Sequence, residues 1–84
     1  MEGLDVPREG VDSVSHRQVF REEIRNAIRE AIFSGKLNPG DRIIETYWAR
    51  ELGVSQGPVR EAIRDLEAMG LVETVPFKGS RVRT

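Results

Sequence analysis

The chain has 84 residues, 38% of them hydrophobic and 32% charged, which is the composition of one small globular domain and not of a disordered chain. It has no cysteine for a disulfide or a thiolate metal site, and no apolar run near the roughly 20 residues that span a bilayer. We expect a cytoplasmic protein that holds neither a metal ion nor a cofactor, and the net charge of −1 gives no direct sign of a nucleic-acid partner.

The acidic charge is concentrated at the N-terminus. Residues 1–14 carry four acids against one arginine, a sum of −3, so the remainder of the chain carries +2. The same residues contain Pro7 and two glycines, show no sustained periodicity, and lack the basic start and apolar stretch of a secretory signal. We therefore predict a disordered leader over residues 1–14 and a folded domain over residues 15–84.

A first helix is predicted from Ser15 to the residues before Gly35. Ser15 and Gln18 form a capping-box pattern, and Gly35 favours the left-handed conformation that ends helices. Pro39-Gly40 then marks a turn. The predicted apolar face repeats at helical spacing and comprises Phe20, Ile24, Ala27, Ile28, Ala31 and Ile32.

The next elements are a very short strand and a short helix. Ile43 and Ile44 are β-prone, and residues 45–52 place Trp48 and Leu52 on the same helix side as Ile44. We predict that this side, Trp48 included, packs into the core.

A third helix follows after Gly53. Ser55 can accept a hydrogen bond as its cap, and Pro58 fits within its first turn, where an amide has no helical partner. The helix is predicted to run to about Met69 and to end at Gly70. Its predicted buried face is Val59, Ala62, Ile63, Leu66 and Met69, and its exposed face is Gly57, Arg60, Arg64 and Glu67.

The C-terminal residues predict a β-hairpin. Residues 71–75 and 80–84 form its strands, residues 76–79 its turn, and Val72 and Val82 its apolar anchors. The chain is thus mainly α with a small β-hairpin, in the order of a winged helix-turn-helix domain. The helix-turn-helix would occupy about residues 45–64 and the wing about residues 71–84. In such a domain the second helix supports the third in a DNA major groove, while the hairpin reaches backbone or minor groove.

Two arginines on the third helix are candidate DNA contacts. Arg60 and Arg64 are four residues apart, so they project side by side, and guanidinium groups suit guanine edges and phosphates. The alternative is an ordinary solvated surface, since Glu61 or Asp65 could pair with them.

The predicted wing is basic, because the last nine residues contain three cations and no acid. Lys78, Arg81 and Arg83 could contact DNA or could only keep an exposed edge strand soluble. Gly79 would let the backbone approach sugar or phosphate closely, although a hairpin turn also favours glycine.

Residues 37–82 resemble the DNA-binding signature of the GntR family of bacterial transcriptional regulators. The resemblance implies sequence-specific binding of double-stranded DNA by a homodimer on a palindromic operator, with a sensory domain after the DNA-binding head. The head alone would be monomeric or weakly associating. The interval between Gly40 and Gly53 looks like the FadR-like (FCD) branch, whose sensory domain is an all-helical bundle. The matching segments are Pro39-Gly40, Leu52-Gly53-Val54-Ser55, Pro58-Val59-Arg60-Glu61-Ala62, Leu66-Glu67, Gly70-Leu71-Val72 and Gly79.

The resemblance also implies which residues meet DNA. Ser55, Gln56, Gly57 and Arg60 would begin the recognition helix, and Lys78-Gly79 would form the tip of the wing. This chain departs from the family pattern at two positions, where Gln56 and Thr46 stand in place of arginines seen in many members. Because glutamine favours adenine and arginine favours guanine, Gln56 predicts a different base preference at one operator position.

Two other classes of function are alternatives to DNA binding. A winged helix can bind protein instead, and the negative net charge leaves that alternative open. An enzyme is not expected, because the sequence offers no Ser/His/acid set and no phosphate-binding glycine loop.

Overall fold

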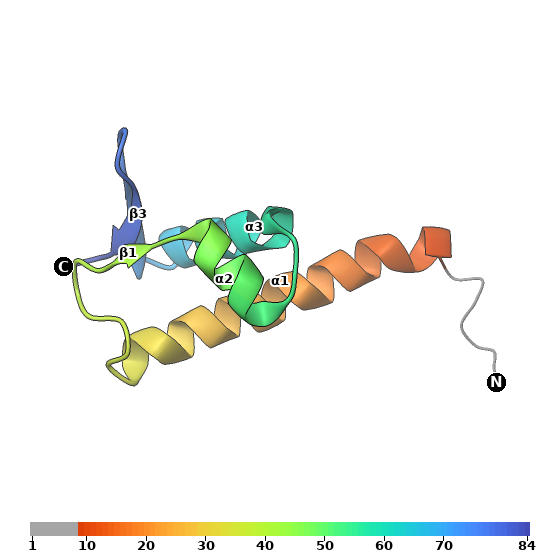
Figure 1. Cartoon of the computed structure of the whole chain (residues 1–84), viewed down its shortest axis with the longest axis horizontal. Helices are drawn as coiled ribbons and strands as arrows, with labels where there is room; N and C mark the ends of the chain where they lie inside the picture. The colour runs from red at the N-terminus through yellow and green to blue at the C-terminus, as the bar shows by residue number, and fades with distance from the viewer. Residues whose placement is uncertain (1–8) are drawn as a thin grey trace.

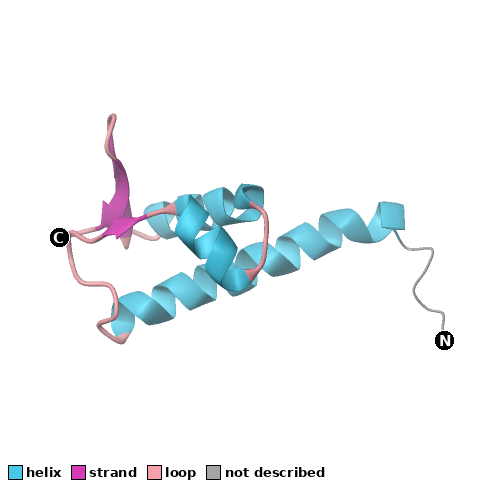
Figure 2. Ribbon diagram, viewed as in Figure 1, coloured by secondary structure: helices cyan, strands magenta, loops and turns pink. Residues whose placement is uncertain are grey.

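The computed structural model describes the backbone from Glu9 to Thr84 and the side chains from Phe20 onward. Figures 1 and 2 show α2 and α3 gathered on one side of the long α1, with the β2–β3 hairpin standing away from the helices. This arrangement is the predicted winged helix-turn-helix. The elements are α1 (Glu9–Phe33), β1 (Arg42–Ile43), α2 (Glu45–Leu52), α3 (Gln56–Ala68), β2 (Val72–Val75) and β3 (Gly79–Val82).

Helix α1 begins earlier than the sequence predicted. It starts at Glu9 and not at Ser15, so residues 9–14 of the predicted leader are helical, while residues 1–8 lie outside the described part of the chain. A capping box permits a helix to start but does not stop it from extending, and no proline follows Pro7 before the helix ends. Within residues 9–84, no helix combines the length and the apolarity needed to cross a membrane.

Glycines end the helices, as predicted. Gly35, Gly53 and Gly70 have φ values of +88°, +69° and +82°, in the left-handed region that closes a helix. Helix α3 ends at Ala68, and the prediction that Met69 is buried was wrong, since this residue is 46% exposed. Met69 occupies the C-cap of α3, where the chain leaves the helix, so its side chain no longer follows the buried stripe.

The core lies where α1 packs on α3 and where the sheet closes the same space. Ile24 and Ile28, one turn apart on α1, are almost completely buried. The other four residues predicted for the inner face of α3 are buried as well, which confirms the helical periodicity there; they are Val59, Ala62, Ile63 and Leu66. The whole cluster comprises Ile24, Ile28, Ile43, Ala49, Val59, Ala62, Ile63, Leu66, Val72 and Val82.

The inner side of α2 differs from the prediction. Ile44 and Leu52 are 50% and 37% exposed, and the buried residue of α2 is Ala49. Ile44 is the N-cap of α2, with extended backbone angles (φ −104°, ψ 119°), so helical spacing does not apply to its side chain. Trp48 packs against the core as predicted, although it stays partly accessible.

Strand β1 joins the hairpin to give a three-stranded antiparallel sheet with the order β1-β3-β2. Val72 lies directly opposite Val82, and both side chains are buried, which confirms them as the apolar anchors of the hairpin. Because β3 is the central strand, the wing is attached to the loop between α1 and α2 as well as to α3. This attachment fixes the direction in which the hairpin leaves the body of the domain (Figure 2).

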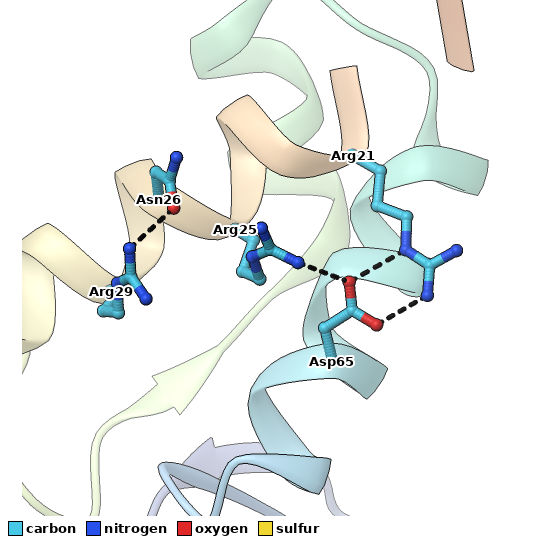
Figure 3. A network of polar contacts seen from close by, with 5 residues as sticks. All are labelled: Arg21, Arg25, Asn26, Arg29 and Asp65. Atoms are coloured by element: carbon cyan, nitrogen blue, oxygen red, sulfur yellow. Dashed lines mark hydrogen bonds and ion pairs between the residues drawn. The ribbon is translucent and has the colours of Figure 1, made fainter. Parts of the chain in front are cut away.

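An ion-pair network joins α1 to α3 (Figure 3). Arg21 donates from Nε to Asp65 Oδ2 at 2.8 Å and from Nη2 to Oδ1 at 2.5 Å, and Arg25 Nη1 adds a contact of 3.3 Å. These hydrogen bonds lower the pKa of Asp65, and the Arg21 bond contributes most. The network therefore orients α3 on α1 through a carboxylate whose two oxygens both accept hydrogen bonds.

Candidate nucleic-acid interface

The outer face of α3 presents the side chains that the sequence predicted for DNA. Arg60 and Arg64 are exposed, on the side of the helix away from the core residues. Ser55, Gln56 and Gly57, at the start of the helix, are exposed as well. The geometric condition for a recognition helix is met, because this segment is helical and its arginines are not covered by the protein.

The N-terminus of α3 is left open. Ser55 is the N-cap residue, but its side chain makes no capping hydrogen bond, contrary to the prediction. The reason is local, because Pro58 occupies the third helical position, whose N–H a capping serine usually bonds. No acidic residue lies in the first turn of α3. The positive end of the helix dipole is therefore not neutralised there and is suited to an anion such as a phosphate.

Gly57 supports the same conclusion from packing. A side chain at this position would meet no atom within 4 Å, so nothing inside the described domain requires a glycine there. Glycine within a helix costs roughly 0.5–1 kcal/mol relative to alanine. Its presence fits a surface that something outside the chain approaches closely.

Arg60 has a partner, but not one of those considered from the sequence. Its guanidinium donates to Glu45 at the start of α2, with distances of 3.4 Å from Nε to Oε2 and 3.3 Å from Nη2 to Oε1. Asp65, one of the acids considered for Arg60 and Arg64, is bonded to α1 instead. The contact with Glu45 is long and exposed, so it orients Arg60 while leaving the guanidinium easy to transfer to a stronger acceptor.

A shallow groove connects the recognition helix to the wing. Gln56 from α3 and Thr46 from α2 line it together with Gly79 and Ser80 from β3, around a volume of about 270 Å³. Two predicted site residues that are 23 positions apart in the sequence, Gln56 and Gly79, thus border one surface feature.

The wing carries the remaining predicted residues. Lys78, Gly79 and Arg81 are exposed. A second hollow of about 380 Å³ is lined by hairpin residues from Val75 to Arg81, Phe77 included, and by Gly40 and Arg42; its cations are Arg42, Lys78 and Arg81, and no acid lines it. Gly79 has a φ of +84°, so the turn itself requires glycine there. Arg81 is partly neutralised by Glu73 on β2, at 2.7 Å from Nε to Oε2.

The sequence reasoning missed Arg42, which borders both hollows. On the sheet it lies directly opposite Arg81, and its guanidinium has no hydrogen-bond or ion-pair partner among residues 20–84. Like charges facing each other across strands are unfavourable unless something compensates them. Only the register of β1 against β3 brings these two arginines together, and no local pattern in the sequence indicates that register.

No group of three or more histidine, cysteine or acidic side chains gathers within the described part of the chain in a way that could hold a metal ion.

The family comparison fits this geometry. The model of the family described as "Bacterial regulatory proteins, gntR family" matches residues 20–82. The chain belongs to the GntR family. The match covers α1 from Phe20 onward, both helices of the helix-turn-helix and nearly all of the wing.

Relatives within the GntR family agree in sequence and in fold. The "Probable D-xylose utilization operon transcriptional repressor" of Paenarthrobacter nicotinovorans is 42% identical over 67 residues, covering 80% of this chain and 30% of that protein. A GntR family member from Pseudomonas syringae pv. tomato str. DC3000 superposes with a TM-score of 0.72 and 37% identity, over 80% of this chain and 28% of that one.

A third structure shows a related domain with DNA. The DNA-binding domain of AraR, crystallised in complex with operator ORX1, has a TM-score of 0.69 and 31% identity over 75% of this chain and 77% of that one. The relatives are transcriptional regulators, and their fold is the same winged helix. The chain spans only 21% to 39% of the length of the first three protein relatives that it matches.

Proposed function

We propose that this chain binds double-stranded DNA in a sequence-specific manner, as the DNA-binding head of a bacterial transcriptional regulator. The observation that carries the proposal is the continuous exposed surface from α3 to the wing, where Gln56 and Gly79 border one groove. Arg42 and Glu45 also line this groove, and Lys78 and Arg81 are exposed on the hairpin beside it. Such a surface matches a duplex, since α3 has the width of a major groove and the hairpin can reach the adjacent backbone or minor groove.

Each part of this surface has a distinct role in the proposal. Gln56 and Arg60 contact base edges, with Glu45 directing the Arg60 guanidinium until guanine or phosphate replaces it. Ser55 and Gly57 bring the open first turn of α3 against a phosphate. The cations outside the first turn bind the phosphate backbone and set the register without reading sequence; they are Arg42, Arg64, Lys78 and Arg81.

The regulator of which this domain forms a part is proposed to act as a homodimer on a palindromic operator in the cytoplasm. The DNA-binding domain is proposed over residues 15–84, with the helix-turn-helix at about 45–64 and the wing at about 71–84, and α1 extends from it back to Glu9. The interval between Gly40 and Gly53 favours a sensory domain of the FadR-like, all-helical branch. Because one head meets one half-site, the 84-residue chain is expected to be monomeric or weakly associating, and a tight dimer in sedimentation would contradict this.

The decisive experiment is an NMR titration with a duplex selected by the chain from a random pool. We expect the amide signals of Gln56, Arg60 and Gly79 to shift, while that of Ala31 in the buried part of α1 stays in place. A random duplex of equal length is the control, and it should bind more weakly and with a steeper dependence on salt. If no duplex moves these signals, the chain is not a DNA reader, and a winged helix that binds protein becomes the better explanation.

A further inference from the structure

The tip of the wing holds an aromatic side chain that the fold does not use. Phe77 is fully exposed, at 107% of its reference accessibility, and it makes no contribution to the hydrophobic core. Other partly exposed apolar residues such as Tyr47 still lie against neighbours, here the ring of Trp48 at 5.5 Å. Phe77 therefore carries apolar surface that only a partner could cover.

The backbone at Phe77 is also unfavourable for a phenylalanine. The N–H of Lys78 donates to the carbonyl of Val75 at 2.9 Å, which closes a tight turn with Pro76 and Phe77 at its centre. Phe77 has a φ of +65°, and it is the only described residue other than glycine with a positive φ. Turns of this kind favour glycine or asparagine at that position. A bulky ring held in this conformation indicates a use outside the fold.

The surroundings of Phe77 indicate the chemistry of the partner. The hollow beside it is lined by Arg42, Lys78 and Arg81, and it contains no acid. Of these three cations, Arg81 is paired with Glu73, while Arg42 and Lys78 keep their charge uncompensated. An exposed apolar ring beside such cations suits neither an ordinary protein core nor a basic surface. It suits a polyanion with an apolar interior, which is the arrangement of phosphates around stacked base pairs.

We propose that Phe77 is a wedge that enters the minor groove of the operator beside the recognition helix and partly unstacks one base step, while the neighbouring cations hold the flanking phosphates. The inference rests on the proposed DNA binding and deepens it. A ring makes no hydrogen bond to a base, so its sequence preference comes from how easily a step opens, with pyrimidine–purine steps such as TA favoured over stiff AA steps. Phe77 thus contributes specificity at a position where no base edge is contacted.

The test uses the duplex that the chain selects from a random pool, in two versions that carry TA or AA at the step facing the wing. Three variants are compared with the unmodified chain: Phe77→Gly, Phe77→Ala and Phe77→Leu. Phe33→Ala is the matched control, because Phe33 is a 68% exposed phenylalanine at the C-terminal end of α1 and not on the wing. Affinity, end-to-end distance of the duplex by fluorescence energy transfer, and thermal stability are measured for each.

We expect Phe77→Gly and Phe77→Ala to weaken binding to the TA duplex by roughly tenfold, to abolish the TA-over-AA preference, and to straighten the duplex. Phe77→Leu keeps an apolar wedge and should retain most of the preference. Phe77→Gly should melt no lower than the unmodified chain, because glycine relieves the positive φ, so lost affinity cannot be ascribed to unfolding. Phe33→Ala should change none of these quantities.

Two results would overturn the inference and can be told apart. If the unmodified chain binds its selected duplex and Phe77→Gly binds within twofold on both versions, the wedge is wrong and the proposed function stands. The same conclusion follows if affinity falls equally for TA and AA. If the unmodified chain selects no duplex at all, the proposed function and the wedge are both wrong.

Discussion

The contact between α1 and α3 and the surface formed by α3 with the wing use the same charged residue types in opposite ways. In the first region Asp65 takes hydrogen bonds from two arginines, the shorter ones at 2.5 and 2.8 Å (Figure 3). In the second, the pair of Arg60 with Glu45 is at 3.3 to 3.4 Å. The charges between α1 and α3 thus form a network that joins the two helices. Near the proposed DNA, Arg60 is held loosely, and the side chains of Arg42, Arg64 and Lys78 have no hydrogen-bond or ion-pair partner among residues 20–84. Arg81 is the exception, because it has a contact of 2.7 Å with Glu73.

This difference implies a separation of effects. Substitutions between α1 and α3 should change the free energy of unfolding and affect DNA binding only through it. Substitutions on the exposed surface should change DNA binding and leave stability almost unaltered. Four substitutions, taken from the largest expected change to the smallest, test whether stability and DNA binding can be changed separately.

The largest effect is expected for Leu66→Ala. Leu66 is completely buried on the inner face of α3, and its truncation should lower the free energy of unfolding by about 2–5 kcal/mol, enough to unfold much of so small a domain. Urea titration followed by circular dichroism measures it. Met69→Ala, at an exposed residue just beyond the same helix, is the control and should change stability by less than about 0.5 kcal/mol. Equal effects of the two variants would mean that α3 is not anchored by this face.

Local periodicity explains how much of this region the sequence could predict. Val59, Leu66 and their neighbours repeat every three or four residues, so the buried face of α3 was predictable without a structure. The prediction that Ile44 packs into the core was wrong because helical spacing was applied to it, although Ile44 is the N-cap of α2 and lies outside the helix. The partners of Asp65 could not be found either, since Arg21 lies 44 residues away in the sequence.

The residues of the proposed interface were likewise predictable from the sequence only in part. Exposure of Gln56, Arg60 and Lys78 followed from their positions on predicted elements, and the structure places them on the surface. Arg42 was not predicted as an interface residue, because its position beside Arg81 depends on the register of β1 against β3. Phe77 was not predicted either, because a turn sequence does not reveal how completely a side chain is exposed. The assignment of these residues to DNA stays a prediction.

On the exposed surface, the largest expected change is a shift of base preference in Gln56→Arg. Glutamine pairs with adenine and arginine with guanine, so the variant should favour guanine at one operator position by about 1–3 kcal/mol. Sequencing of duplexes selected from a random pool measures the shift, and stability should be unaltered within about 0.5 kcal/mol. Ser34→Arg, which adds the same charge just after α1 and outside the proposed interface, is the control and should leave the base preference unchanged. An unchanged preference in Gln56→Arg would show that this position does not read a base.

Asp65→Asn tests the charged contact between α1 and α3. The substitution removes the carboxylate that accepts from Arg21 and Arg25, and we expect a loss of about 1 kcal/mol at neutral pH. Because those hydrogen bonds lower the pKa of Asp65 in the folded chain, its contribution is present at neutral pH and disappears as the pH falls below about 4. The difference between the two proteins in urea titrations should therefore shrink on acidification.

The matched control for that experiment is Glu67→Gln, an exposed acid on the same helix. It should lower stability by less than about 0.5 kcal/mol at neutral pH. A difference between wild type and Asp65→Asn that persists at pH 2 would mean that the asparagine disturbs packing and that the charge is not the cause.

Lys78→Ala is expected to have the smallest effect on stability and so to separate DNA binding from stability most clearly. Lys78 is exposed on the wing and its ammonium group has no hydrogen-bond or ion-pair partner among residues 20–84, so the free energy of unfolding should change by less than about 0.5 kcal/mol. If it contacts one phosphate, the slope of log affinity against log salt should become shallower by roughly 0.9, equally for all duplexes, because one fewer counterion is released. Lys36→Ala, which removes an exposed lysine from the loop after α1, should leave the slope unchanged. An unchanged slope in Lys78→Ala would remove this lysine from the interface, and a marked loss of stability would place its charge among those that serve the fold.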